Sequence, residues 1–232
     1  MLFSAGRRPS FDQVAALSGS GGFAVSYAPW PKEGWFEALV TGLTFEVHGL
    51  APAPAEASVP IAHRYGLTSG WWDPKVEAVT IRLGPHLAGG GAMPPIVRGA
   101  VALAMALSTL ADLEAVVWLP ARSAMAPAYF AEAALAWVAG GAFPTPGLVA
   151  LVDAPDGGVA SQGLAFFTGQ EVAAAPWSGS TKSDLARCVV RAVHGLIEHG
   201  PVETTTVLPG PTGGRMRIDV EGRGRLRIRT DE

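Results

Sequence analysis

The chain has 232 residues, of which 49% are hydrophobic and 16% charged, and its formal net charge is -3 at pH 7. A chain of this length and composition can bury a sizeable hydrophobic core, which excludes a mainly disordered protein. The near-neutral charge argues against a protein whose main task is to bind phosphate backbones, so we do not expect a nucleic-acid partner.

The N-terminal segment, residues 1–22, is polar and ends in a run of serines and glycines. It predicts one short helix near Val14–Leu17 and otherwise a flexible lead-in. Residues 23–232 are then expected to form a single α+β domain.

The sequence shows no membrane or export segment. Its longest uncharged apolar stretch, between Arg98 and Asp112, has thirteen residues, fewer than the ~20 that cross a bilayer. Arg7–Arg8 is followed by a proline and then an acid, where a signal sequence would be apolar. We therefore expect a cytoplasmic protein without membrane contact.

Alternating apolar and polar residues predict strands in the first half of the chain. Such an alternation lies in Val76–Leu83, and the apolar run Glu114–Leu119 is typical of a central strand. Earlier strands are expected at Phe23–Tyr27 and within Phe36–Leu50. The Pro/Ala-rich residues 51–60 are expected to form a loop.

Three main helices are predicted from apolar periodicity and from start and stop residues. They span about 95–112, 127–138 and 181–199. Further strands are expected at 148–153, 163–168, 171–175, 202–208, 215–220 and 225–230.

The order of these elements predicts the fold class. Strands outnumber helices and arrive in β-β-α-β groups, which is typical of an α+β fold with about three helices packed on a mixed, largely antiparallel sheet. The same order occurs at about 40–119 and again at about 161–208, which permits two similar halves.

Arginines line one face of the last predicted strand. Arg225, Arg227 and Arg229 alternate with Leu226 and Ile228, so the two sets face opposite sides. Such a ladder could meet an acidic partner or a phosphate backbone. Nearby acids favour the alternative, a solvated edge strand that its charges protect from further pairing.

No signature of a cofactor or metal site is found. The glycine run Gly89–Gly91 lacks the spacing of a phosphate-binding loop, and neither a GxSxG elbow nor an HExxH helix occurs. The single cysteine, Cys188, lies in an apolar helical pattern, so we expect it in the core. We predict neither a cofactor nor a metal.

Glu46 and His48 share one face of a predicted strand with Thr44. A glutamate and a histidine two residues apart can work as acid and base. The same alternation is typical of any solvated strand face, which is the interpretation favoured here.

Arg122 and Ser123 follow the predicted central strand, a position where α/β proteins often bind ligands. Arg122 offers a planar guanidinium for a carboxylate or phosphate, and the Ser123 hydroxyl lies beside it in sequence. They form the best candidate anion site, although an arginine after a strand usually pairs with a surface acid.

Thr168, Gln170 and Glu171 surround Gly169 between two predicted strands. In a functional interpretation Glu171 is a general base, and Thr168 and Gln170 bind or orient a ligand. In a structural interpretation, which the lack of a nearby nucleophile favours, these side chains satisfy backbone groups of a tight turn.

Two adjacent tryptophans, Trp71 and Trp72, lie in a loop or at the start of a strand. If their side chains are exposed, they would anchor an interface or stack on a ligand. If their side chains are buried, they would complete the core under the loop at 51–70, and this is the favoured interpretation.

Four runs stand out as motifs: Trp72–Pro74, WLPAR at Trp118–Arg122, Trp137–Pro144 and GLAFFTGQE at Gly163–Glu171. In these runs the chain resembles a family of uncharacterised bacterial proteins, a domain of unknown function. The resemblance covers about residues 40–210 and implies a compact domain. It implies no established reaction, but it directs attention to Arg122, Thr168, Gln170 and Glu171.

Two functions fit these observations. The first, favoured because no catalytic spacing is present, is a non-catalytic interaction or accessory protein, such as an immunity-type partner that masks another protein. The alternative is a metal-independent hydrolase or transferase acting on a small anionic molecule, with Arg122 binding the anion and Glu171 as base. The sequence does not determine the oligomeric state.

Overall fold

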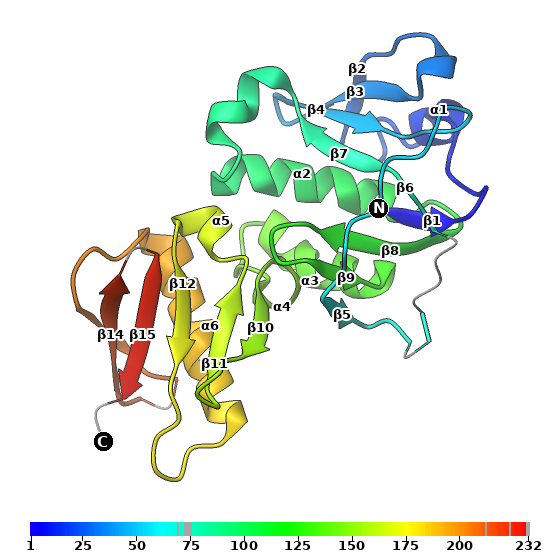
Figure 1. Ribbon diagram of the computed structural model, residues 1–232. Coiled ribbons are helices and arrows are strands. Elements are labelled where there is room, and N and C mark those ends of the chain that lie inside the picture. Colours follow the sequence, from blue (N-terminus) through cyan, green and yellow to red (C-terminus); the bar gives the residue numbers. More distant parts are fainter. Residues whose placement is uncertain (69, 72–75, 212, 223, 231–232) are drawn as a thin grey trace. The chain divides into compact units, whose positions relative to one another are not determined.

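The structure, a computed structural model, describes residues 1–68, 70–71, 76–211, 213–222 and 224–230. The chain forms two compact units, Met1–Gly141 and Ala142–Glu232, and Figure 1 labels most of their elements. Helices and mostly antiparallel strands confirm the predicted α+β class. The sequence led us to expect one domain over 23–232, and the structure has three sheets that are divided between the two units.

The first unit contains β1 (Leu2–Ser4), α1 (Phe11–Ala15), β2 (Ala24–Tyr27), η1 (Pro31–Glu33), β3 (Trp35–Val40), β4 (Leu43–His48), β5 (His63–Tyr65), β6 (Val76–Ala78), β7 (Thr80–Leu83), η2 (Pro85–Gly90), α2 (Pro94–Leu107), β8 (Leu113–Trp118), β9 (Ser123–Met125) and α3 (Pro127–Val138). Its strands form a five-stranded sheet, β5-β9-β8-β1-β6, and a four-stranded sheet, β2-β3-β4-β7. β8 is thus the expected central strand, and α3 has the predicted bounds.

The N-terminal residues are part of the core and do not form a flexible lead-in. β1 lies between β8 and β6, and Met1–Phe3 are buried. The Met1 amino group donates a hydrogen bond to the Val79 carbonyl at 2.8 Å. The short helix predicted nearby is α1, which begins with a capping box between Ser10 and Gln13. Residues 1–22 are polar as a whole, and sequence reasoning therefore missed the short apolar run Met1–Phe3, part of which pairs in the sheet.

The predicted strand Val76–Leu83 is two strands in two sheets. β6 pairs with β1, whereas β7 pairs with β4. Between them, the Val79 N–H donates to the Met1 carbonyl. Ala78 and Val79 are both buried, and these two successive apolar residues interrupt the alternation where the chain changes sheets.

One face of the four-stranded sheet packs on α2, which lies beneath it in Figure 1. Phe36, Ala38, Phe45 and Val47 are buried on this inner face. Gly99 of α2 permits the close approach, since a Cβ at this position would lie 3.0 Å from the Phe45 ring. The intervening residues of each strand therefore project from the outer face.

The second unit contains α4 (Thr145–Leu148), β10 (Ala150–Asp153), β11 (Val159–Gln162), α5 (Ala165–Thr168), β12 (Glu171–Ala174), α6 (Lys182–His199), β13 (Thr206–Pro209), β14 (Arg215–Gly222) and β15 (Arg225–Thr230). The sheet order is β10-β11-β12-β15-β14-β13, with β12 and β15 parallel. The strand predicted at 163–168 is wrong. Most of that segment is the helical turn α5, which ends at Gly169 with a φ of 73°.

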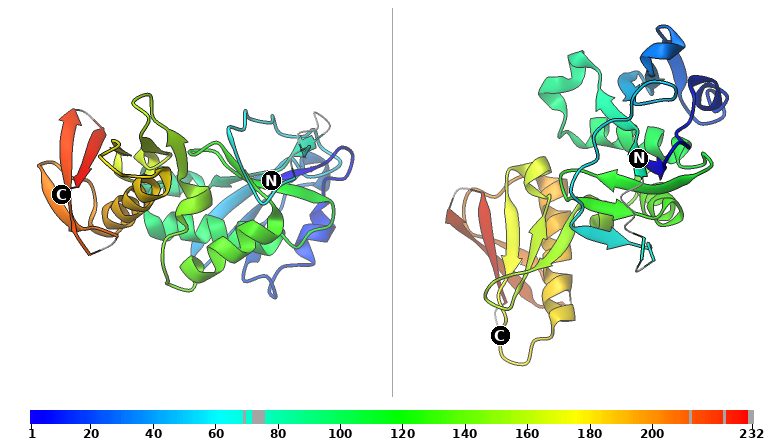
Figure 2. Two further views of the ribbon diagram at one scale, coloured as in Figure 1. Left: turned by 90° about the horizontal axis from the view of Figure 1, so that it is seen from below. Right: turned by 45° about the vertical axis from the view of Figure 1, so that its right-hand side comes forward.

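α6 lies along one face of this sheet, as both views in Figure 2 show. It begins with a capping box between Thr181 and Asp184. Cys188, Val189 and Leu196 are buried on its inner side, which confirms Cys188 as a core residue. Burial raises the pKa of the Cys188 thiol.

β15 is an interior strand and not the predicted edge. It lies between β12 and β14, and Leu226 and Ile228 are buried. The spacing of strands along the chain does not indicate which neighbours flank β15. The arginine ladder therefore lies across the open face of the sheet rather than along an edge.

The two β-β-α-β segments are not similar halves. In the first unit the strand after α2 is β8, which belongs to a different sheet from β4 and β7. In the second unit the strand after α6 is β13, which shares one sheet with β11 and β12. The same order of elements along the chain thus leads to different topologies.

Candidate functional site

Glu171, the predicted general base, is held in a hydrogen-bond network. Its carboxylate accepts hydrogen bonds from the Ser161 hydroxyl and from the N–H groups of Gly163 and Ala165, the last two at 2.8 and 3.0 Å. The Val172 N–H donates to the same hydroxyl at 2.9 Å. The carboxylate thus fixes the turn between β11 and α5, and its oxygens are occupied where a base would need one free.

Thr168 and Gln170 also satisfy backbone groups. The Gln170 side-chain amide donates to the Val202 carbonyl at 2.7 Å and accepts from the Val202 N–H at 2.9 Å. The Thr168 hydroxyl donates to the carbonyls of Leu164 and Gln170. The geometry of Thr168, Gln170 and Glu171 therefore fits the structural interpretation of this motif, a polar turn that joins α5, β12 and the segment after α6.

Arg122 and Ser123 lie in the first unit, where the chain turns from β8 to β9. Arg122 has a φ of 51°, and its carbonyl accepts from the N–H groups of Ala62 and His63 at 2.8 and 3.2 Å. Its Nε donates to the Pro60 carbonyl at 3.3 Å. The Arg122 side chain is exposed, whereas Ser123 is completely buried. The two side chains do not form the expected shared anion site.

The structure brings Thr168, Gln170 and Glu171 together in the second unit, and it places Arg122 in the first. Of the two adjacent tryptophans, Trp71 packs partly buried against the apolar cluster of β1, β6, β8 and β9, as the core interpretation expects. Trp72 and the rest of its motif lie outside the described residues.

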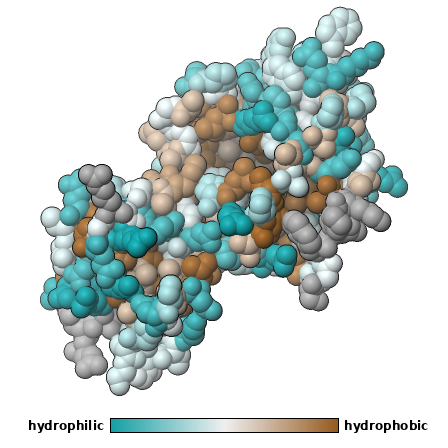
Figure 3. All heavy atoms as spheres, viewed as in Figure 1, coloured by the Kyte–Doolittle hydropathy of each residue, from teal (hydrophilic) through white to brown (hydrophobic). Residues whose placement is uncertain are grey.

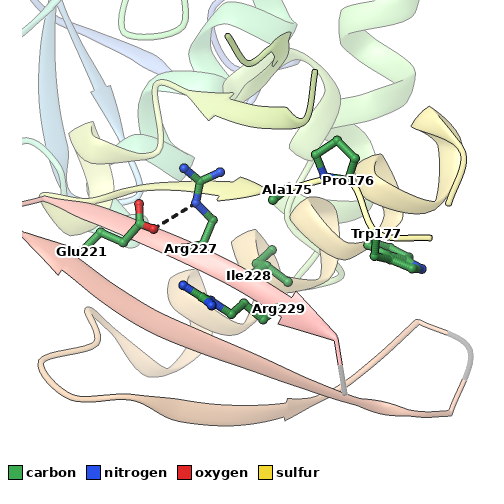
Figure 4. A pocket seen from close by; sticks show the side chains of 7 residues that line it. All are labelled: Ala175, Pro176, Trp177, Glu221, Arg227, Ile228 and Arg229. Atoms are coloured by element: carbon green, nitrogen blue, oxygen red, sulfur yellow. Dashed lines mark hydrogen bonds and ion pairs between the residues drawn. The ribbon is translucent and has the colours of Figure 1, made fainter. Parts of the chain in front are cut away.

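A pocket of about 430 Å³ lies beside β15 in the second unit, and Figure 4 shows its lining. It is lined by Ala175, Pro176, Trp177, Glu221, Arg227, Ile228 and Arg229. An indole and two guanidinium groups could in principle receive a planar anion.

Acids already neutralise the arginines of this pocket. Arg227 contacts Glu221 at 3.1 Å and Asp156 at 2.6 Å, and Arg229 contacts Asp219 at 3.1 Å. Glu221, followed by Asp156, raises the pKa of Arg227. Figure 3 shows hydrophilic residues over β14 and β15. An anionic ligand would have to displace these carboxylates, so the pocket does not favour anion binding.

A more distinctive cluster lies on the outer face of the four-stranded sheet. Trp35 of β3 lies directly opposite His48 of β4, and their rings stack with centroids 5.4 Å apart. Tyr27 of β2 packs against Trp35 with centroids 5.7 Å apart. His48 Nε2 lies 2.8 Å from Glu46 Oε2. Side chains from three strands thus form one continuous cluster.

Large apolar side chains in β2, in β3 and in the loop that joins them are open to solvent. Trp30, in the loop between β2 and β3, is 80% exposed, and Tyr27 and Leu39 are 56% and 39% exposed. We call Tyr27, Trp30, Trp35, Leu39 and His48 the aromatic face. Single exposed apolar residues are ordinary, but several within one hairpin are typical of a contact surface.

Sequence reasoning identified Glu46 and His48 as neighbours on a strand but missed Trp35. The signal in the sequence is Gly42, which lies between two strand-like runs. In the structure Thr41 and Gly42 have φ values of 48° and 84°, as a two-residue hairpin loop requires. A loop at this position fixes the register and places Trp35 opposite His48.

In the part of the chain that the structure describes, no group of three or more His, Cys, Asp or Glu side chains is arranged to hold a metal ion. None of the helices found there combines the length and the apolar character needed to span a bilayer. Comparison with protein-family models, curated proteins and solved structures found no match to this chain.

Proposed function

We propose that this is a non-catalytic interaction protein that binds another protein through its aromatic face. The observation that carries the proposal is the exposure of Trp30 and Tyr27, at 80% and 56%, in the hairpin whose next strand carries the stacked Trp35. Tryptophan and tyrosine contribute most of the binding energy in many protein interfaces. A surface that leaves them in water is expected to gain stability when a partner covers it.

The contacts that hold Trp35 in place support the proposal. Trp35 is held between strands by the His48 stack, and its indole N–H donates to Glu33 at 3.2 Å. The opposite side of β3 and β4 is buried, since Phe36 packs against Phe11 and Phe23 and Phe45 lies against Gly99 of α2. Side chains that are already ordered lose little conformational entropy on binding.

The alternative function, a metal-independent hydrolase or transferase, has less support. Its base, Glu171, is engaged by three donors, and its anion site loses Ser123 to burial. The proposal keeps the accessory or immunity-type role and the location in the bacterial cytoplasm that the sequence led us to expect.

Site-specific photo-crosslinking in cells tests this proposal. A photo-reactive amino acid at position 30 is expected to capture a partner protein, which is then purified and titrated against the unmodified chain. Position 135 is the matched control, because Leu135 on α3 of the same unit is 62% exposed. Equal capture at both positions, or a captured protein that does not bind the purified chain, would refute the proposal.

A further inference from the structure

Carboxylates border the aromatic face. Glu37 of β3 lies directly opposite Glu46 of β4, and Glu33 accepts from the Trp35 indole N–H. The Ser26 hydroxyl donates to Glu37 at 2.6 Å. Among the residues that the structure describes, neither Glu33 nor Glu37 forms an ion pair.

The cations on this side do not balance the acids. His48 is hydrogen-bonded to Glu46, and Arg82, opposite Glu46 on β7, pairs with Glu56 at 2.5 Å. Lys32 of η1 is exposed next to Glu33 in sequence. The surface around the rings is therefore both aromatic and acidic.

We infer that the aromatic face takes a basic segment of the partner, rich in arginine or lysine; this inference rests on the proposed function. Aromatic ring faces attract cations, and a guanidinium can stack on an indole while it donates to a carboxylate. A cation between Glu37 and Glu46 also removes the repulsion of two like charges at opposed positions. A neutral or acidic segment gains neither effect.

Fluorescence anisotropy with two labelled peptides tests the inference on the full chain. One peptide alternates arginine and serine, and the other alternates glutamate and serine. The arginine peptide is expected to bind, and Glu37→Gln is expected to weaken it about tenfold. Glu132→Gln is the matched control, since Glu132 is an exposed glutamate on α3, and it should leave the affinity unchanged.

Three results would overturn the inference: no binding of the arginine peptide, equal binding of the glutamate peptide, or equal weakening by Glu37→Gln and Glu132→Gln. The crosslinking experiment separates this failure from failure of the proposed function. If position 30 captures a partner through a segment without arginine or lysine, and Glu37→Gln leaves its affinity unchanged, the function stands and the inference falls. If position 30 captures no more than position 135, the function itself fails.

Discussion

Glu37 and Glu46 occupy directly opposed positions on β3 and β4. Both side chains belong to the outer face of the sheet, next to the stacked rings of Trp35 and His48. Like charges at opposed positions destabilise a sheet, and the buried inner face of the same strands compensates for this cost. Under the function proposed above, we interpret the opposed glutamates as part of the binding surface, since they do not stabilise the fold.

Glu37→Gln is expected to increase the free energy of unfolding by about 0.2–1 kcal/mol, because it removes the repulsion from Glu46. Urea denaturation of the wild type and the variant measures this change. Glu132→Gln, on α3 away from this pair, should leave stability as it is. A loss of stability in Glu37→Gln would mean that Glu37 has a structural role that its hydrogen bond from Ser26 does not explain.

Trp30→Ala is expected to change the free energy of unfolding by less than about 0.5 kcal/mol, because the side chain is 80% exposed. Denaturation of Leu135→Ala provides the comparison. A Trp30→Ala variant destabilised by several times this amount would show that Trp30 supports the fold, and its exposure would then say little about binding.

Glu171→Ala is expected to destabilise the second unit by about 1–3 kcal/mol, since it leaves backbone donors without their carboxylate. Hydrogen exchange gives the sharpest measurement, because the amides of Gly163 and Ala165 should exchange faster. Glu203→Ala, at an exposed glutamate of the same unit, should leave both amides protected. Unchanged exchange in Glu171→Ala would instead return Glu171 to the role of an available base.

Acid is expected to weaken the first unit through Glu77. Arg8 donates to Glu77 at 2.7 Å, and this hydrogen bond lowers the pKa of the carboxyl. A carboxyl with a lowered pKa in the folded state stabilises the fold above its unfolded pKa, and this contribution is lost as pH falls through the folded pKa. Unfolding measured between neutral and acidic pH should therefore show a shallower loss in Glu77→Gln. Identical slopes for the two proteins would contradict the assignment.

Sequence patterns predicted the fold best where local signals determine it. α3 begins at Pro127 and ends before the glycine pair at 140–141, α6 lies within the predicted range 181–199, and Leu43–His48 alternates as a half-buried strand. The patterns failed where distant pairing decides the outcome. The adjacent apolar residues Ala78 and Val79 interrupt the alternation, but no local pattern shows that the first part of Val76–Leu83 pairs with the N-terminal strand.

The candidate sites also differ in whether local residues or distant strand pairing determine them. The polar turn at Thr168–Glu171 was found from its residues, and the structural interpretation weighed for it matches the observed hydrogen bonds. The aromatic face was missed because Tyr27, Trp35 and His48 come from three strands, and only the register of the hairpin brings them together.

The central claim is that the aromatic face binds a protein partner, and its most direct test is the affinity of the captured partner for the wild type and for Trp30→Ala. Calorimetric titration should show a dissociation constant at least about tenfold higher for Trp30→Ala, as expected for an exposed tryptophan at the centre of an interface. Leu135→Ala should bind like the wild type. An unchanged dissociation constant for Trp30→Ala would contradict the claim, because binding would then use another surface of the protein.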